Sequence, residues 1–324
     1  MEPPAEPVLE TQPVPTSRFA GFWRRLAALA VDGLVLGAIG FPLGLLLGER
    51  LAPVGTPARL IGLLVILPYL GVLGSHVGGG QTVGKRLLGL RVVDANGLPL
   101  SLARSFVRAA LLSLPWIFNG IRFASVGPVV LATLWVASIL IFGVGGAIIG
   151  TYLLNRRTRQ ALHDLFVGSF VIRADGLGLR VPAMSTRRPM VASMAWVSLV
   201  AAGTTAIALM GPSLIASQFP PVLMESISAI PGASSMEIKS LTTRGAGRSS
   251  KVIVAVLWFR GPPEDMKKAA QEVAAATLKY HPDAATVPTL AVTVIRGWDV
   301  GIASMTSAQN YVQTPAQWRA ELGR

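Results

Sequence analysis

Two charged residues lie where charges are costly, in an apolar stretch near the N-terminus. Residues 23–47 hold roughly twenty apolar side chains, enough to cross a bilayer core of about 30 Å. Asp32 lies inside this stretch, seven residues after Arg25. A carboxylate in hydrocarbon costs about 2.5–3.5 kcal/mol on insertion scales, so it needs a physical reason. The chemistry to expect is a buried charge pair or the coupling of a proton or ion.

The spacing of Arg25 and Asp32 argues against a direct pair. Both fall on one helix face but about 10.5 Å apart along the axis. Helical side chains lean toward the N-terminus, so we expect Arg25 and Arg24 to reach back to the cytoplasmic interface. Arg108 should lie at a depth similar to that of Asp32, about 10 Å along another helix. Three interpretations of Asp32 stay open: a buried pair with Arg108, an acid that couples transport, and a protonated acid facing a polar cavity.

A second polar group lies between the apolar stretches. Asp164 follows His163, but one His and one Asp fall short of a metal's ligand set, so no metal site is expected. We expect Asp164 to pair with Lys85, Arg86 or a nearby backbone amide at the cytoplasmic surface. No residues have the spacing of a catalytic set, so neither an enzyme nor a cofactor is expected.

The composition is that of a membrane protein. The chain has 324 residues, of which 52% are hydrophobic and 14% charged, whereas a soluble domain has about 25% charged residues. The net charge is +13, but most basic residues flank apolar stretches, as the positive-inside bias produces. This placement argues against a nucleic-acid partner. The chain has no cysteine, which excludes disulfides and a thiolate nucleophile.

The basic segments predict how many times the chain crosses the membrane. The loop around Lys85 and Arg86 and the segment 155–189 are both basic, so both should be cytoplasmic. An even number of crossings must then separate them. We therefore expect five crossings, at residues 23–47, 60–76, 102–121, 126–154 and 190–210. The N-terminus would be cytoplasmic and the C-terminal domain extracytoplasmic; the alternative is that residues 102–121 lie on the membrane surface.

The remaining segments predict a small cap and a soluble domain. Residues 88–93 and 166–173 have strand character and are expected to pair as a cytoplasmic cap. Beyond residue 212 we expect an antiparallel sheet with one helix packed across it; its strands are 235–243, 251–259 and 289–295, and its helices 266–280 and 315–322. The predicted fold class is an all-α membrane helical bundle with a β-hairpin-like cap, plus a C-terminal α+β domain. The predicted parts are a disordered cytoplasmic tail (1–17), a membrane domain (18–175), a basic linker (176–189), an additional transmembrane helix (190–211) and a soluble domain (212–324).

Three sequence motifs resemble the RDD family of bacterial membrane proteins, which is named for one Arg and two Asp. They are GFWRRLAALAVDGLVLG, GQTVGKRLLGLRVVDANGLPLSLARSFVR and RRTRQALHDLFVGSFVIR, in family order across residues 18–175. Arg25, Asp32 and Asp164 match the three family residues. The resemblance implies a multi-pass protein of the cell membrane, and transport of unidentified ligands has been suggested for the family. The crossing at 190–210 and the C-terminal domain depart from the family pattern.

These observations lead to two functional hypotheses. The first is transport of a small ligand or ion through a polar cavity between the helices. The candidate ligand-binding or coupling residues are Arg25, Asp32, Arg108 and Asp164, with Lys85, Arg86 and His163 as candidates in the cytoplasmic loops. The second is a non-catalytic anchor or scaffold that presents the C-terminal domain outside the cytoplasm. The expected partners are the lipid bilayer and the small ligand or ion, and homo-oligomerisation stays open.

Overall fold

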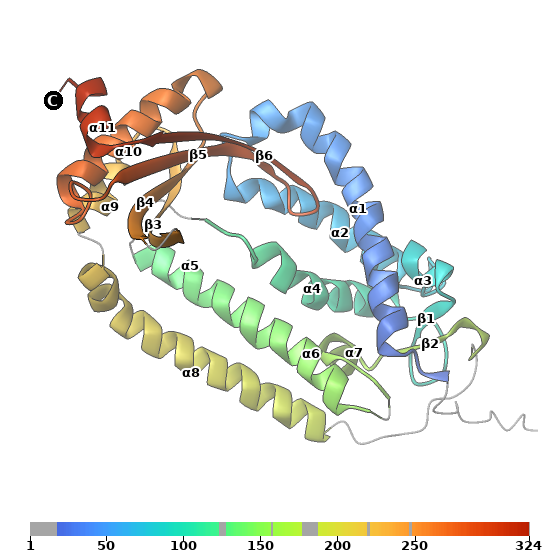
Figure 1. The fold of residues 1–324 in the computed structure, drawn as a ribbon. Coiled ribbons are helices and arrows are strands. Elements are labelled where there is room, and N and C mark those ends of the chain that lie inside the picture. Colours follow the sequence, from blue (N-terminus) through green and yellow to red (C-terminus); the bar gives the residue numbers. More distant parts are fainter. Residues whose placement is uncertain are drawn as a thin grey trace, which may run out of the picture. The chain divides into compact units, whose positions relative to one another are not determined.

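The computed structural model describes residues 18–122, 128–156, 158–176, 187–218, 221–245 and 248–323. The predicted tail at 1–17 and most of the predicted linker lie outside these residues. Backbone contacts divide the chain into two compact units. The first unit consists of residues 1–38, 63–116 and 139–201, and the second of residues 39–62, 117–138 and 202–324. The long helix α1 (Phe22–Leu51), labelled in Figure 1, contributes to both units.

Among the described residues, four helical segments are long and apolar enough to cross a membrane, namely Phe22–Leu51, Thr56–Leu73, Leu131–Leu154 and Arg187–Met210. They correspond to four of the five predicted stretches. The other stretch forms α4 (Leu102–Phe118), whose 17 residues extend over about 25 Å.

The membrane segments have these bounds in the structure. The first is α1 (Phe22–Leu51), and the second combines a short 3-10 turn with α2 (Arg59–Leu73). The next consists of α5 (Pro128–Ser138), a π-helical turn (Ile139–Val144) and α6 (Gly145–Leu154). The last lies in α8 (Arg187–Gln218), which continues eight residues beyond the predicted crossing and is followed by α9 (Pro221–Ser228).

A two-stranded sheet joins distant parts of the first unit. Its strands are β1 (Leu90–Val93), which follows the short helix α3 (Val83–Leu87), and β2 (Phe170–Arg173), which follows the short helix α7 (Leu162–Val167). The strands run antiparallel, and Val93 lies opposite Phe170. The predicted pairing of these two segments is therefore confirmed. Because α3 and α7 precede the paired strands, the sheet also brings their polar residues into one region.

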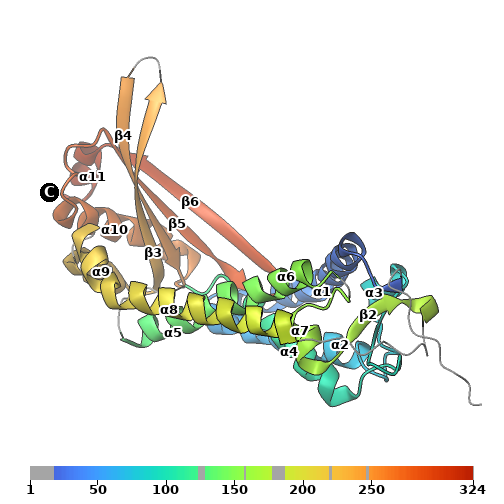
Figure 2. The ribbon, with the colours of Figure 1, turned by 90° about the horizontal axis from the view of Figure 1, so that it is seen from below.

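The second unit contains a four-stranded sheet in the order β3, β4, β5, β6 (Figure 2). The strands are β3 (Ala233–Gly245), β4 (Arg248–Phe259), β5 (Thr289–Asp299) and β6 (Ser304–Gln313). The prediction of a purely antiparallel sheet is wrong, since β5 runs parallel to β4. The helix between them, α10 (Met266–Tyr280), provides the crossover that a parallel pair requires. A terminal helix, α11 (Pro315–Glu321), completes the unit.

The core of this sheet lies between α10 and one face of β4 and β5. Leu290 and Val292 alternate with less buried neighbours on β5, and both are fully buried. On α10, Ala270 and Val273 lie three residues apart, a helical spacing that places them on one face, and both are fully buried. Trp318 of α11 is also buried, and its indole N–H donates a hydrogen bond to the Leu290 carbonyl (3.0 Å).

The turn between β5 and β6 packs against α1 within the second unit. Gly40, Gly44 and Gly48 form a stripe of small residues at four-residue intervals on α1. Trp298 lies against Gly44 and Gly48, and Ile302 lies against Gly40. A Cβ atom added at Gly44 would be 2.1 Å from the Trp298 ring. The missing side chains therefore allow the turn to approach the helix backbone closely.

This packing predicts opposite effects for two glycine substitutions on α1. Gly44→Ala should lower the free energy of unfolding by about 1–3 kcal/mol, because the new methyl group overlaps the Trp298 ring. Gly33→Ala should be neutral or stabilising by up to about 1 kcal/mol, because nothing lies within 4 Å of its Cβ and Ala favours helix. Unfolding of the purified protein in detergent, followed by circular dichroism, measures both. Equal stability of the two variants would contradict this packing.

Candidate functional site

Asp32 is buried in the first unit, where α1 meets the start of α3. Its carboxylate accepts hydrogen bonds from the Tyr69 hydroxyl (2.7 Å), the Thr82 hydroxyl (2.6 Å) and the Gly84 backbone N–H (2.8 Å). Thr82 is the N-cap of α3, so the carboxylate lies at the end of a helix where unpaired N–H groups point outward. The Lys85 amine is 3.9 Å from the same carboxylate. Three neutral donors and one amine therefore surround Asp32.

A glycine makes this contact between α1 and α3 feasible. A Cβ atom added at Gly84 would be 2.0 Å from the Ala28 carbonyl oxygen, a distance that no side chain tolerates. With hydrogen in that place, the Gly84 N–H comes within reach of Asp32. Close packing of α3 against α1 thus explains the glycine at position 84, which the residue pattern alone did not reveal.

Asp164 is fully buried and lies between two arginine side chains. Arg108 on α4 donates from Nε and approaches with Nη2, both 2.8 Å from one carboxylate oxygen. Arg25 on α1 donates from Nη1 to the other oxygen at 3.1 Å. The Ser169 hydroxyl (3.0 Å) and the Ala161 backbone N–H (3.3 Å) also donate to the carboxylate. Hydrogen bonds and two opposite charges therefore compensate for the burial of this acid.

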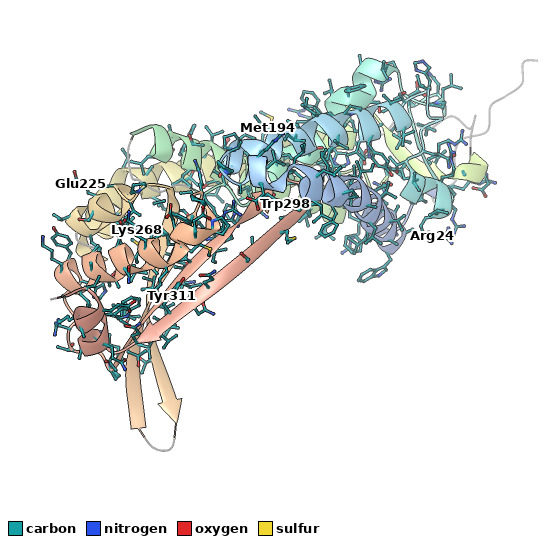
Figure 3. All side chains as sticks on the ribbon, turned by 90° about the horizontal axis from the view of Figure 1, so that it is seen from above. Arg24, Met194, Glu225, Lys268, Trp298 and Tyr311 are labelled. Atoms are coloured by element: carbon teal, nitrogen blue, oxygen red, sulfur yellow. The ribbon has the colours of Figure 1, made fainter. Side chains whose placement is uncertain are left out.

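The predicted pair of Asp32 and Arg108 is wrong. Arg108 binds Asp164 instead, because its long side chain reaches back toward the start of α4, where α7 lies. The prediction that Arg25 reaches the cytoplasmic interface stays a prediction. Arg25 does lean toward the start of α1, but it ends on Asp164 and is 15% exposed, whereas Arg24 is exposed (Figure 3).

The predicted partners of Asp164 are confirmed in part. A nearby backbone amide binds it, as expected, but the cations are the two arginines and not Lys85 or Arg86. Lys85 lies beside Asp32, and Arg86 is exposed. Residue spacing does not indicate which of the two carboxylates Lys85 and Arg108 bind. Tyr69 and Thr82 were not predicted as partners of Asp32. A lone Tyr in an apolar stretch and a Thr before a short helix are sequence features that point to such a role.

Burial shifts the pKa values of three groups outside the membrane segments. Burial lowers the pKa of His163 to about 3, so its imidazole is neutral although Asp164 is 3.6 Å away. Burial, reinforced by the charge of Arg108, lowers the pKa of Lys85 to about 8. Burial alone would raise the pKa of Asp164, but Arg108 and Arg25 hold it below its usual value. Asp164 is therefore permanently ionised, whereas Lys85 titrates near physiological pH.

A cavity of about 370 Å³ lies beside these residues within the first unit. Its polar lining comes from Arg25, Asp32, Lys85, Arg108, Tyr152 and His163. The rest of the wall is formed by apolar side chains of α1, α2, α4, α6, β1 and β2, together with Ala161. No group of three metal-binding side chains occurs in the described part of the chain. The volume falls within the usual range of ligand sites, about 300–1,000 Å³.

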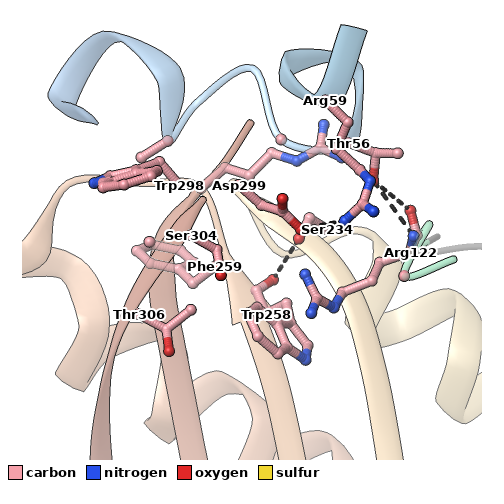
Figure 4. Close-up of a pocket in the computed structure, with 15 residues that line it drawn as sticks. Thr56, Arg59, Arg122, Ser234, Trp258, Phe259, Trp298, Asp299, Ser304 and Thr306 are labelled. Atoms are coloured by element: carbon pink, nitrogen blue, oxygen red, sulfur yellow. Dashed lines mark hydrogen bonds and ion pairs between the residues drawn. The ribbon is translucent and has the colours of Figure 1, made fainter. Parts of the chain in front are cut away.

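A smaller cavity, of about 60 Å³, lies in the second unit (Figure 4). Arg59 is buried there, forms an ion pair with Asp299 and donates from Nε to the Ile117 carbonyl (2.9 Å). Arg122 stacks on Trp258, with its guanidinium 3.5 Å from the ring centroid. The space is far smaller than a ligand site, so we assign these contacts to the stability of the second unit.

Comparison with known proteins gives a family but no solved relative. The model of the RDD family matches residues 19–168. An uncharacterised protein of Bacillus subtilis (strain 168), YckC, is 26% identical over 155 residues, which cover 48% of this chain and 85% of that protein. No solved structure matches. The match includes the buried residues Asp32, Arg108 and Asp164, and Arg25, which is partly exposed. Residues 19–168 therefore match the RDD family model, in a chain whose described part has four candidate membrane-spanning helices.

Proposed function

We propose that this protein transports a small ligand or ion across the membrane, and that the cavity of the first unit is its binding site. The observation that carries this proposal is the combination of a cavity of about 370 Å³ with charged side chains in a membrane protein. Charges inside a membrane protein are costly and usually mark a pathway for a substrate, ion or proton. In this proposal the protein moves its ligand unchanged and is not an enzyme.

Lys85 and Asp32 are the groups that would couple transport to a proton. The Lys85 amine lies 3.9 Å from the Asp32 carboxylate, and both line the cavity. Loss of the Lys85 proton changes the charge of the cavity by one unit. Binding of a charged ligand and binding of this proton must therefore influence each other to the same extent. Asp164 has a different part, because two arginines bind it and keep it ionised.

The environment of the polar loops supports five crossings. The β1–β2 pairing joins the segment after α2 to the segment after α6. At the other end of α4, the Arg122 backbone N–H and the Thr56 hydroxyl form a hydrogen bond (3.3 Å) that joins the connection after α1 to the connection after α4. A helix whose two ends meet different loops in this way is expected to cross the membrane. The basic loops are then cytoplasmic and the C-terminal domain extracytoplasmic.

A second candidate function is an anchor or scaffold for the C-terminal domain. It is favoured by the contacts of the β5–β6 turn: Trp298 packs on α1, Asp299 pairs with Arg59, and Arg296 pairs with Glu49 at 2.6 Å. In this case the cavity would have no role in movement of a ligand. The two functions predict different results for substitutions at Asp32.

Transport can be tested by proton movement in vesicles. Protein reconstituted with an entrapped pH dye should change the internal pH on addition of sodium, potassium or phosphate, if one of them is carried. Asp32→Asn should abolish the response, because the cavity loses the charge that opposes Lys85. Asp175→Asn is the matched control, since Asp175 is exposed. A response that Asp32→Asn leaves unchanged would reject the coupling role and favour the anchor.

The buried amine of Lys85 predicts how stability depends on pH. An unfolded Lys has a pKa of about 10.4, whereas that of Lys85 in the folded protein is about 8. Between these values the unfolded chain binds the proton that the folded protein has lost, so the free energy of unfolding should rise with pH. Lys85→Arg stays charged and should lack this rise. Thermal unfolding in detergent from pH 7 to 10 measures it, and parallel curves would contradict a buried, titrating amine.

The proposed topology predicts where protease can act. In intact cells, protease added outside should cleave the C-terminal domain at an exposed residue, such as Lys239 of β3. The N-terminal segment should be cut only after the membrane is permeabilised. Immunoblots with tags at each terminus distinguish the two fragments. Protection of the C-terminal domain in intact cells would contradict five crossings with a cytoplasmic N-terminus.

A further inference from the structure

We propose that the ligand of the cavity in the first unit is an anionic amphiphile from the bilayer, with a phosphate or carboxylate head and an acyl chain. This inference rests on the proposed function, because it names the ligand of the cavity that was proposed there as the binding site. Three independent observations support it: unpaired polar atoms, the balance of charge, and an opening among lipid-facing side chains.

Three buried polar atoms of the cavity lining have no hydrogen-bond partner among the described residues. They are Arg25 Nε, Tyr152 Oη and His163 Nδ1. Buried polar groups in native proteins are nearly always paired, so three such atoms in one cavity indicate a missing partner. The Arg25 N–H can only donate, and the Tyr152 hydroxyl readily donates. The missing partner is therefore expected to carry hydrogen-bond acceptors.

The charges around the cavity favour an anion. Arg25, Lys85 and Arg108 contribute three positive charges, whereas Asp32 and the adjacent Asp164 contribute two negative charges. Neutral His163 adds none, so one positive charge remains when Lys85 is protonated. An uncompensated charge in a region of low dielectric constant is unfavourable. An anionic head beside Arg25 and Lys85 would compensate for it.

The opening of the cavity favours a ligand with an acyl chain. Phe22, Leu26, Leu29 and Ile149 line the cavity, yet 40–61% of each residue is exposed. All four lie on membrane helices, where exposed apolar side chains face acyl chains rather than water. The cavity thus opens toward the bilayer, and a chain-bearing ligand can enter sideways. The head would lie at the Arg25 end and the chain along these apolar side chains.

Retention of lipid by the full-length protein tests the proposal. The protein is placed in phosphatidylcholine nanodiscs with increasing fractions of phosphatidic acid, and retained lipid is counted by native mass spectrometry. Phosphatidic acid should be retained in preference to phosphatidylcholine, whereas inorganic phosphate should not displace it at equal concentration. Equal retention of both lipids would reject the anionic head. Displacement by inorganic phosphate would show that the ligand is a free anion from water.

Three variants separate the cavity from general binding to a basic surface. Tyr152→Phe should weaken retention of phosphatidic acid by roughly tenfold, because it removes a hydroxyl that binds a charged group. This hydroxyl has no protein partner in the described structure, so the variant should fold normally. Leu112→Trp should block retention by filling the cavity. Tyr311→Phe, in the second unit, is the matched control. Wild-type retention in the first two variants would overturn the proposal.

The binding experiment tests the proposed ligand, and the flux experiment tests transport, so the two results are independent. Retention of phosphatidic acid without any flux of the tested ions in the vesicle assay would reject transport of those ions and keep the proposed ligand. Flux without selective retention would reject the ligand and keep transport. Retention is an equilibrium measurement, so it needs no assumption about the direction of movement.

Discussion

The structure of the first unit depends on the burial of one carboxylate between two guanidinium groups. Arg25 belongs to α1, Arg108 to α4 and Asp164 to α7, and the sequence separation of Arg25 and Asp164 is 139 residues. Removal of one partner of such a pair leaves an uncompensated buried charge, at a cost of about 3–5 kcal/mol. The position of α7, and with it the pairing of β1 with β2, is therefore coupled to this charge cluster.

The same cluster determines the environment of the other acid. Because Asp164 binds both arginines, Asp32 is left with neutral donors and the amine of Lys85. An ion pair with an arginine would be permanent, whereas a lysine whose pKa is near 8 gains and loses its charge under physiological conditions. Asp164 and Asp32 therefore have different roles. Asp164 holds helices together, whereas Asp32 lies beside the titratable amine of Lys85 at the cavity.

Much of the architecture was predictable because it follows from local pattern. Apolar length identified four candidate membrane-spanning segments, strand character identified the β1–β2 pair, and helical spacing identified the buried face of α10. Three motifs also indicated the RDD family, which the family model confirms. β6 was missed because its residues are mostly exposed and show no apolar alternation. The parallel direction of β5 depends on the crossover through α10, which strand pattern does not encode.

The partners of the charged side chains were harder to predict. Estimates of depth along a helix placed Arg108 level with Asp32, but an arginine side chain spans several ångströms and leans toward the start of its helix. The Arg108 side chain is therefore long enough to bind Asp164 instead of Asp32. The roles of Tyr69 and Thr82 depend on how α2 and α3 pack against α1, and no periodicity within either segment specifies that packing.

The glycine stripe on α1 also bears on self-association. Gly40, Gly44 and Gly48 have the small-xxx-small spacing through which membrane helices commonly dimerise. Here the side chains of Trp298 and Ile302 already cover that stripe. A second copy of α1 cannot pack there while the β5–β6 turn stays in place. Any homo-oligomer of this protein must therefore form through another surface, or only after the turn has left the helix.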